Sequence, residues 1–281
     1  MPESLSTLSP LAKSGFHPGI SRAMRQAMKI RLAQSADEIR MAQRLRYHVF
    51  HEEYGARLKG QHGLDADRFD PASEHLLVID AEAPTKADFV LEDGALVGTY
   101  RLISQAKAQT LGGFYSQSEF DLAPLLDRKR QLRFLELGRS CVLKQARGTA
   151  VIELLWQGIW DYVRQNHIDV MLGCASFEGT DPQAHAAALS FLAQHATAEG
   201  DWHVRAKPEL FQEMNRLSPG SYDVRRAAVS LPPLIKGYWR LGCRFGEGCV
   251  IDADFNSVDV LVVLPVSFIN PRYFARFGAP T

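Results

Sequence analysis

The sequence predicts a fold of the α/β (α+β) class, because segments typical of strands and of helices alternate along the chain. Residues 29–33 alternate like a strand, and Ser35-Ala-Asp-Glu38 follows as a capping box that begins a helix. From Leu135 onward, apolar strand-like segments alternate with longer segments that have helical periodicity. Alternation of this kind is typical of a sheet covered by helices.

The remaining elements are expected from turn and capping signals. We expect strands at 29–33, 75–80, 95–104, from 135 onward, 168–175, 250–255 and 258–266, and helices at 35–50, 149–165, 182–195 and 232–241. Pro182 lies near the first turn of one helix, and Gly242 ends another. The segment Asp252-Ala-Asp254-Phe-Asn256 lacks the later glutamate of an EF-hand, so we expect a hairpin turn there.

Composition excludes several classes of protein. The 281 residues are 46% hydrophobic and 23% charged, which is ordinary for a globular protein. Because 32 basic side chains balance 32 acidic ones, no nucleic-acid partner is expected. No apolar run approaches the roughly 20 residues that span a bilayer, and the start of the chain lacks a secretory signal, so we expect a cytoplasmic protein. The cysteines form no C-x-x-C pair and are expected as buried, reduced thiols: Cys141, Cys174, Cys243 and Cys249.

Residues 1–28 form a basic N-terminal extension, whereas residues 29–281 are expected to form a single domain. Between residues 4 and 36 the chain has no acidic side chain, and apolar residues recur at helical spacing. Two interpretations stay open. The extension is either a basic amphipathic segment in peripheral contact with the inner face of the membrane, or a partly ordered segment that packs on the domain.

Residues 135–155 combine a strand, a glycine-containing turn and a helix. The strand carries Glu136 and Arg139, and the turn reads Gln145-Ala-Arg147-Gly148-Thr149-Ala150. The first backbone N–H groups of the helix have no partners within it and lie at its positive end, so they are suited to binding phosphate. A candidate catalytic carboxylate therefore lies about ten residues before a candidate phosphate-binding turn.

Two motifs in this order resemble the GCN5-related N-acetyltransferase family. The turn Gln145-Ala-Arg-Gly148-Thr-Ala150 fits the Q/R-x-x-G-x-G/A loop that binds pantetheine phosphate in that family. Tyr238-Trp-Arg-Leu-Gly242 fits its Y-x-x-x-G motif. The resemblance implies a mixed twisted sheet flanked by helices, and an acyl donor with a phosphopantetheine arm.

The N-terminal half is similar to the acyl-homoserine-lactone synthases, which use the same fold with acyl carrier protein as donor. The residues that match their pattern are Arg46, Phe50, Asp67, Asp70, Arg101, Glu136 and Arg139. Six residues after the phenylalanine that family has a tryptophan, where this chain has Ala56. This departure argues against a homoserine-lactone product.

A closer resemblance, to the bacterial ornithine N-acyltransferases that make lyso-ornithine lipid, covers almost the whole chain after about residue 29. The matching segments are LRYHVFHEEYGA, ELGRSCV, ELLWQGIWDY, MLGCASFEGTDPQAHAAALSFL, LPPLIKGYWRLGC and DFNSVDVLVVLP. The resemblance implies transfer of a 3-hydroxy fatty acyl chain from acyl carrier protein to the α-amine of L-ornithine. No permanently bound cofactor is expected, and because the histidines lack metal-ligand spacing, no metal is expected.

The catalytic roles are assigned to Glu136 and Tyr238. Amide formation requires a neutral amine, so a carboxylate near the thioester acts as general base, and Glu136 is the first candidate. Tyr238 would protonate the leaving thiolate, because a phenol with a pKa near 10 can donate to it. The alternatives are a salt bridge for Glu136 and an ordinary helix-face position for Tyr238.

Further residues are expected to contact the two substrates. The donor phosphopantetheine is expected to contact Cys141, Val142, Gln145, Arg147, Gly148, Thr149 and Ala150. The acceptor is expected to contact Arg46, Phe50, Asp67, Asp70, Arg101 and Arg139, with Glu119 and Asp121 as further candidates for its ammonium. A backbone N–H near Cys141 or Val142 would stabilise the oxyanion, and direct transfer is favoured over an acyl intermediate on Cys141.

Two other functions stay open, namely an acyl-homoserine-lactone type of signal synthase and a non-catalytic module that binds a carrier protein or a membrane. Acyl carrier protein is acidic, so we expect it to dock on a local basic patch. The candidate patches are residues 128–130 and the region of Lys144 and Arg147.

Overall fold

Strands and helices alternate in the computed structural model, which describes residues 27–57, 63–82, 89–147, 149–270 and 273. The strands are β1 (Met28–Leu32), β2 (Glu74–Asp80), β3 (Val90–Leu91), β4 (Gly94–Ser104), β5 (Phe120–Asp121), β6 (Phe134–Val142), β7 (Val170–Glu178), β8 (Arg205–Ala206), β9 (Arg244–Asp252) and β10 (Ser257–Pro265). The α-helices are α2 (Ala36–Tyr47), α3 (Gln105–Thr110), α4 (Ala123–Arg128), α5 (Thr149–Gln165), α6 (Ala186–His195), α7 (Val224–Ser230) and α8 (Pro233–Leu241).

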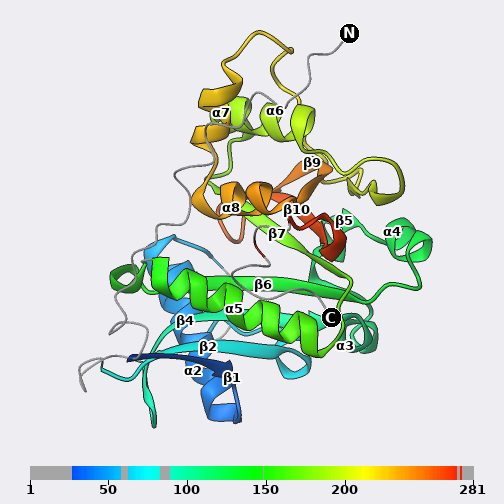
Figure 1. Cartoon of the computed structure of the whole chain (residues 1–281). Helices are drawn as coiled ribbons and strands as arrows, with labels where there is room; N and C mark the ends of the chain where they lie inside the picture. Colours follow the sequence, from blue (N-terminus) through cyan, green and yellow to red (C-terminus); the bar gives the residue numbers. More distant parts are fainter. Residues whose placement is uncertain (1–26, 58–62, 83–88, 148, 271–272, 274–281) are drawn as a thin grey trace.

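The described strands form one mixed sheet in the order β1-β2-β4-β6-β7-β10-β9-β8-β5, with β3 paired to β4 (Figure 1). The pairs β6–β7 and β8–β9 are parallel, and the other pairs along this order are antiparallel. Helices lie against the sheet on both sides. The arrangement confirms the expected mixed sheet flanked by helices.

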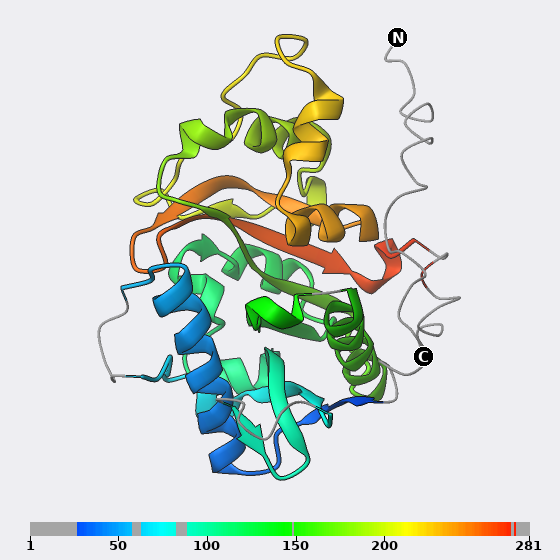
Figure 2. The ribbon, with the colours of Figure 1, turned by 90° about the vertical axis from the view of Figure 1, so that its left-hand side faces the viewer.

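Helices α2 and α5 cover opposite sides of the part of the sheet that contains β2 and β4 (Figure 2). Helix α2 begins at the expected cap, where Ser35 Oγ accepts a hydrogen bond from the Glu38 backbone N–H at 3.2 Å. It buries Ala42 and Leu45 against the sheet, and α5 buries Val151 on the other side. Helices α6, α7 and α8 gather at the opposite end of the molecule, near β9 (Figure 1).

Strands β6 and β7 pair only through residues 134–136 and 170–172, and then diverge (Figure 1). Beyond this point β6 stays paired with β4, and β7 stays paired with β10. Gly173 lies where the two strands begin to part, and a Cβ atom there would be 2.1 Å from the Leu137 carbonyl oxygen. The close backbone approach followed by divergence opens the sheet in its middle.

Most of the expected elements are confirmed. The helix at 149–165 has the expected ends, and the turn between antiparallel β9 and β10 is a hairpin. In that turn Asp252 Oδ1 accepts hydrogen bonds from the backbone N–H groups of Asp254 and Phe255, each at 2.9 Å. Helix α8 ends at Gly242, which has a φ of 110° and so adopts a left-handed conformation that suits glycine.

Some boundaries differ from the sequence prediction. The helix expected at 35–50 ends at Tyr47 and continues as a π-helical turn, His48–Glu53. Strand β9 begins at Arg244 and not at 250. The sequence did not predict its first half, because Gly246 and Gly248 are poor strand formers and interrupt the apolar pattern there. The helix expected at 182–195 begins as a 3-10 turn and becomes α-helical at 186. The short elements β3, β5, β8, α3, α4 and α7 were not predicted.

Residues 1–26, which make up most of the basic extension, lie outside the described residues, so the membrane contact of the extension stays a prediction. In the described part of the chain, no helix combines the length and apolar character that crossing a membrane requires. The four cysteines are free thiols, as expected, although Cys174 is only partly buried.

Replacing Gly173 with alanine should lower the free energy of unfolding by about 1–3 kcal/mol, because the added methyl group overlaps the Leu137 carbonyl and forces the backbone to move. Gly237→Ala is the matched control, since nothing lies within 4 Å of a Cβ at that position in α8. There alanine should stabilise the helix by about 0.5–1 kcal/mol. Urea unfolding measures both changes, and wild-type stability in Gly173→Ala would refute the close approach.

Candidate functional site

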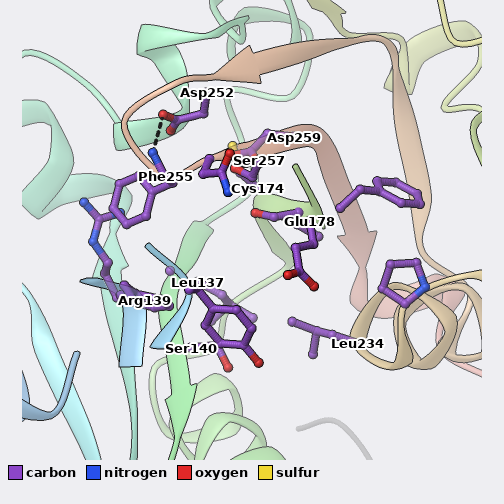
Figure 3. A pocket seen from close by; sticks show the side chains of 18 of the residues that line it. Leu137, Arg139, Ser140, Cys174, Glu178, Leu234, Asp252, Phe255, Ser257 and Asp259 are labelled. Carbon is purple, nitrogen blue, oxygen red and sulfur yellow. Dashed lines mark hydrogen bonds between the residues drawn. The ribbon is translucent and has the colours of Figure 1, made fainter. Parts of the chain in front are cut away.

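A cavity of about 590 Å³ lies beside the point where β6 and β7 part. Its walls come from β6 and β7, from the β9–β10 hairpin and from the start of α8 (Figure 3). The predicted residues Phe50, Arg101, Glu136 and Arg139 line it. Segments far apart in the sequence therefore meet around one space that is large enough for a small ligand.

Glu136 is a buried carboxylate held by three donors. Its oxygens accept hydrogen bonds from the backbone N–H groups of Tyr115 at 2.7 Å and Ser116 at 2.8 Å, and also from Ser116 Oγ. Burial raises the pKa of Glu136, and these hydrogen bonds oppose the increase. Among the described residues Glu136 forms no ion pair, so the predicted alternative of a salt bridge to a neighbouring arginine is wrong.

Arg139 presents its guanidinium between two aromatic rings at the cavity wall. The guanidinium carbon lies 4.6 Å from the centre of the Tyr115 ring and 4.5 Å from the centre of the Phe255 ring. Figure 3 shows Arg139 beside Phe255. Arg139 has a φ of 52°, a conformation that is uncommon for a residue with a side chain and is concentrated at functional sites. This strained conformation therefore occurs at a residue that lines the cavity.

Behind the cavity lies a network of buried ion pairs. Arg46 is fully buried, and its guanidinium binds both oxygens of Asp70, at 2.8 and 2.9 Å. It also contacts Asp65, while Arg101 contacts Asp67 at 2.6 Å and Asp70 at 3.1 Å. Burial favours a raised pKa for Asp70, but the hydrogen bonds and charge of Arg46 outweigh it and hold that pKa well below its usual range.

The network also reaches Arg139, which contacts Asp65 at 3.3 Å and Asp67 at 3.2 Å. Arg46 and Asp70 bind each other and do not line the cavity, so the structure does not bring their polar atoms to the candidate acceptor site. Asp67 is held between Arg101 and Arg139, the two arginines that do line it. The network thus fixes the two cations of the cavity from behind.

Tyr238 lies in a separate small crevice of about 20 Å³, on the side of the sheet that α5 covers. Its hydroxyl is 2.5 Å from the Tyr100 hydroxyl, and its ring packs edge-on against Trp156. Burial raises the pKa of Tyr238 well above its ordinary value, so the phenol keeps its proton at neutral pH. Leu137 and Cys174 line both the crevice and the large cavity, so the two spaces share a wall where β6 and β7 part.

The predicted donor residues lie in varied environments. Cys141 is buried outside the cavity, and burial raises the pKa of its thiol, which argues against a nucleophilic thiolate. Arg147 forms a two-point contact with Glu53, one bond being 2.6 Å, and also donates to the Val142 carbonyl. Ala150 is buried, whereas Gln145 is exposed. Gly148 lies outside the described residues, and α5 begins at Thr149.

Sequence reasoning missed several residues of the cavity. Tyr115 and Ser116 hold Glu136 through backbone groups, which leave no signal in the sequence. Asp259 also lines the cavity from within β10, and a lone carboxylate inside the apolar run 258–266 is a signal that was available. Cys174 lines it as well, although the sequence indicated only an ordinary buried thiol.

Arg46→Ala should lower the free energy of unfolding by about 3–5 kcal/mol, because it removes the cation bound by a buried carboxylate. Arg40→Ala on the same helix breaks the exposed pair with Asp37, and should cost about 0–1 kcal/mol. The folded-state pKa of Asp70 is lowered, so this stabilisation is present at neutral pH and fades as the pH falls below about 4. Urea unfolding at pH 7 and pH 3 tests this, and equal losses in the two variants would contradict it.

Comparison with known proteins identifies the family. The acetyltransferase (GNAT) domain model matches residues 45–157. The L-ornithine N(alpha)-acyltransferase of Agrobacterium fabrum is 47% identical over 254 residues, covering 89% of this chain and 85% of that protein. The enzyme of the same name from Brucella abortus is 46% identical over 256 residues, covering 90% and 89%.

A solved structure supports the fold. FeeM, an N-acyl amino acid synthase from uncultured soil microbes, superposes with a TM-score of 0.50 at 13% identity, covering 88% of this chain and 97% of that one. At this identity the likeness concerns the fold alone. Together with the two close relatives, it confirms the resemblance drawn from the motifs, and the chain belongs to the L-ornithine N(alpha)-acyltransferase family of GNAT-fold acyltransferases.

Proposed function

We propose that the protein transfers a 3-hydroxy fatty acyl chain from acyl carrier protein to the α-amine of L-ornithine, giving lyso-ornithine lipid. Family membership supports the acyl transfer and the acceptor. The observation that carries the proposal is that Glu136 and Arg139 both line one cavity where β6 and β7 part. A carboxylate and a fixed cation are the two groups that an amino acid acceptor requires.

The acceptor binds in the large cavity. Its carboxylate pairs with the guanidinium of Arg139, with Arg101 as the second cation of the same wall. Glu136, held by the backbone of Tyr115 and Ser116, accepts a proton from the α-ammonium directly or through water. The neutral amine then attacks the thioester carbonyl. Phe50 closes the cavity from the π-helical turn after α2.

The donor arm enters from the side of α5, between the diverging strands. The turn at residues 145–150 receives the pantetheine phosphate at the start of α5, and Arg147 exchanges Glu53 for the phosphate. A backbone N–H of β6 near Cys141 or Val142 stabilises the oxyanion. The thioester then lies near Leu137, between the cavity and the crevice of Tyr238.

Collapse of the tetrahedral intermediate breaks the C–S bond and releases a thiolate. Tyr238 donates its proton to that sulfur, while the nitrogen of the new amide loses its second proton to solvent. Tyr238 regains a proton through the Tyr100 hydroxyl at 2.5 Å, which solvent reprotonates in turn, and Glu136 returns its proton to solvent before the next turnover. No acyl-enzyme is formed. The amide product and the free thiol of the carrier leave by opposite sides of the sheet.

Of the two candidate carrier-docking patches, the region of Lys144 is the better supported. Arg128 donates to the backbone carbonyls of Asp201 and His203, and Lys129 pairs with Asp201 at 3.1 Å. Lys144 is exposed in the turn just before α5, so a phosphoserine helix docked there would lie near the donor turn.

Glu136→Gln should lower kcat/KM for ornithine acylation by about 10²- to 10⁴-fold, the range of general-base catalysis. The assay mixes pure protein, 3-hydroxyacyl carrier protein and ornithine, and detects acyl-ornithine by mass spectrometry. Carrier binding should be unchanged. Because the pKa of Glu136 is raised, wild-type kcat/KM should decrease with falling pH at a pH higher than the usual glutamate range, and the variant should lack this decrease.

Glu209→Gln, which changes an exposed carboxylate, is the control, and its kcat/KM should match that of the wild-type protein. Full activity in the Glu136→Gln variant would exclude Glu136 as the general base. Absence of any acyl-ornithine from the wild-type protein would overturn the proposed function itself.

Tyr238→Phe should lower kcat by about 10²-fold or more while leaving KM for ornithine nearly unchanged, because it removes the donor to the leaving thiolate but keeps the ring against Trp156. Tyr222→Phe is the matched control. The Tyr222 hydroxyl donates a hydrogen bond to Gln194 on α6, away from the cavity, so this variant should retain wild-type rates. The rate is measured as release of the carrier thiol. Equal rates for the two variants would remove Tyr238 from the mechanism.

A further inference from the structure

An acidic cluster, formed by Glu119, Cys174 and Asp259, lies at the wall of the cavity. The carboxylate and thiol atoms of the three residues all lie within 4.8 Å of one another. The Cys174 thiol donates to Glu119 Oε2 at 3.3 Å, and Asp259 Oδ1 accepts from Ser257 Oγ at 2.8 Å. Cys174 and Asp259 line the cavity directly, and Figure 3 shows them side by side.

The two carboxylates of this cluster are buried without a cation. Glu119 is 8% exposed and Asp259 is 6% exposed, and neither forms an ion pair with any lysine, arginine or histidine among the described residues. The only side-chain partner of Glu119 there is a thiol, which is a weak donor. Burial, and then the charge of Asp259, raises the pKa of Glu119 to about 8. Two buried carboxylates with no counter-ion favour the arrival of a positive charge.

The geometry of the acidic cluster suits an ammonium group. A charge-assisted N–H···O bond is about 2.8 Å long, so one nitrogen can join two oxygens up to about 5.6 Å apart. The oxygens of Glu119 and Asp259 are closer together than that limit. Arg139 lines the same cavity, so its walls include a basic residue and the acidic cluster.

We propose that Asp259, with Glu119 as a second carboxyl group nearby, binds the side-chain ammonium of the acceptor and makes the enzyme selective for a diamino acid. This inference rests on the proposed function, which supplies an acceptor with one carboxylate and two amines. Asp259 contacts the ammonium from the cavity wall. Glu119 lies next to Cys174 and, with a pKa of about 8, carries a proton at neutral pH; the bound ammonium favours loss of that proton to solvent, which gives a second negative charge, and no covalent bond is made at this subsite.

The test compares ornithine with norvaline, which has the same carbon chain but no side-chain amine. We expect the wild-type protein to prefer ornithine in kcat/KM. Asp259→Asn should reduce that preference by at least about tenfold through a higher KM for ornithine, and Glu119→Gln by a smaller factor, while turnover of norvaline persists. Glu209→Gln, which changes an exposed carboxylate outside the cavity, is the control and should keep the wild-type preference.

A second measurement needs no catalysis. Without donor, ornithine should raise the thermal unfolding temperature of wild-type protein more than norvaline does, and this difference should vanish in Asp259→Asn. An unchanged preference in both variants would overturn the subsite, as would loss of norvaline turnover in a folded variant, which would make the carboxylates catalytic. Selectivity that a chelator abolishes would show a metal site instead. If wild-type protein makes no acyl-ornithine, the proposed function fails and not only this subsite.

Discussion

The buried ion pairs around Arg46 are the constraint on which the rest of the site depends. Arg46 on α2 binds Asp65 and Asp70, and these carboxylates with Asp67 hold Arg101 on β4 and Arg139 on β6. Charges removed from water are unfavourable unless each has partners of good geometry. The network therefore joins one helix, one loop and two strands in a single arrangement, and it fixes the orientation of the cation that faces the cavity.

The parting of β6 and β7 opens the sheet beside this rigid arrangement. Close contact between Gly173 and the Leu137 carbonyl marks the end of the paired segment. Beyond it, Leu137 and Cys174 face both the cavity and the crevice of Tyr238. A thioester that enters from one side can thus meet an amine held on the other. The parallel pairing of β6 and β7 holds the backbone in place up to Glu136, and the divergence beyond it leaves room for the cavity.

Much of the fold was predictable from local signals, because caps, glycines and periodicity depend on neighbours in the chain. Ser35, Gly242 and the helix at 149–165 are of this kind. The network residues other than Asp65 were also identified, but as acceptor ligands. Their pairing with one another depends on tertiary contacts between α2, the following loop and β4, which no local pattern encodes.

The same limit applies within the site. Glu136 and Tyr238 were predicted from motifs, whereas the backbone donors at Tyr115 and Ser116 come from a 3-10 turn whose position is set by packing. Arg147 was expected to be free for phosphate, yet it binds Glu53, which is distant in sequence. Asp259 has a sequence signal, an acid within an apolar strand, but that signal does not reveal Glu119 as its neighbour.

The separation of charge across the cavity bears on which amine is acylated. An ammonium bound to buried carboxylates keeps its proton, since an opposite charge nearby favours the charged form. A protonated amine is no nucleophile, so the proposed cluster of Glu119 and Asp259 would protect the side-chain nitrogen as well as bind it. An α-amine, with a pKa near 8 in peptides, loses its proton far more readily than an alkyl side-chain amine with a pKa near 10. With its carboxylate at Arg139, the α-amine is the nitrogen that Glu136 can deprotonate, and amide formation at that position follows from where the charges lie.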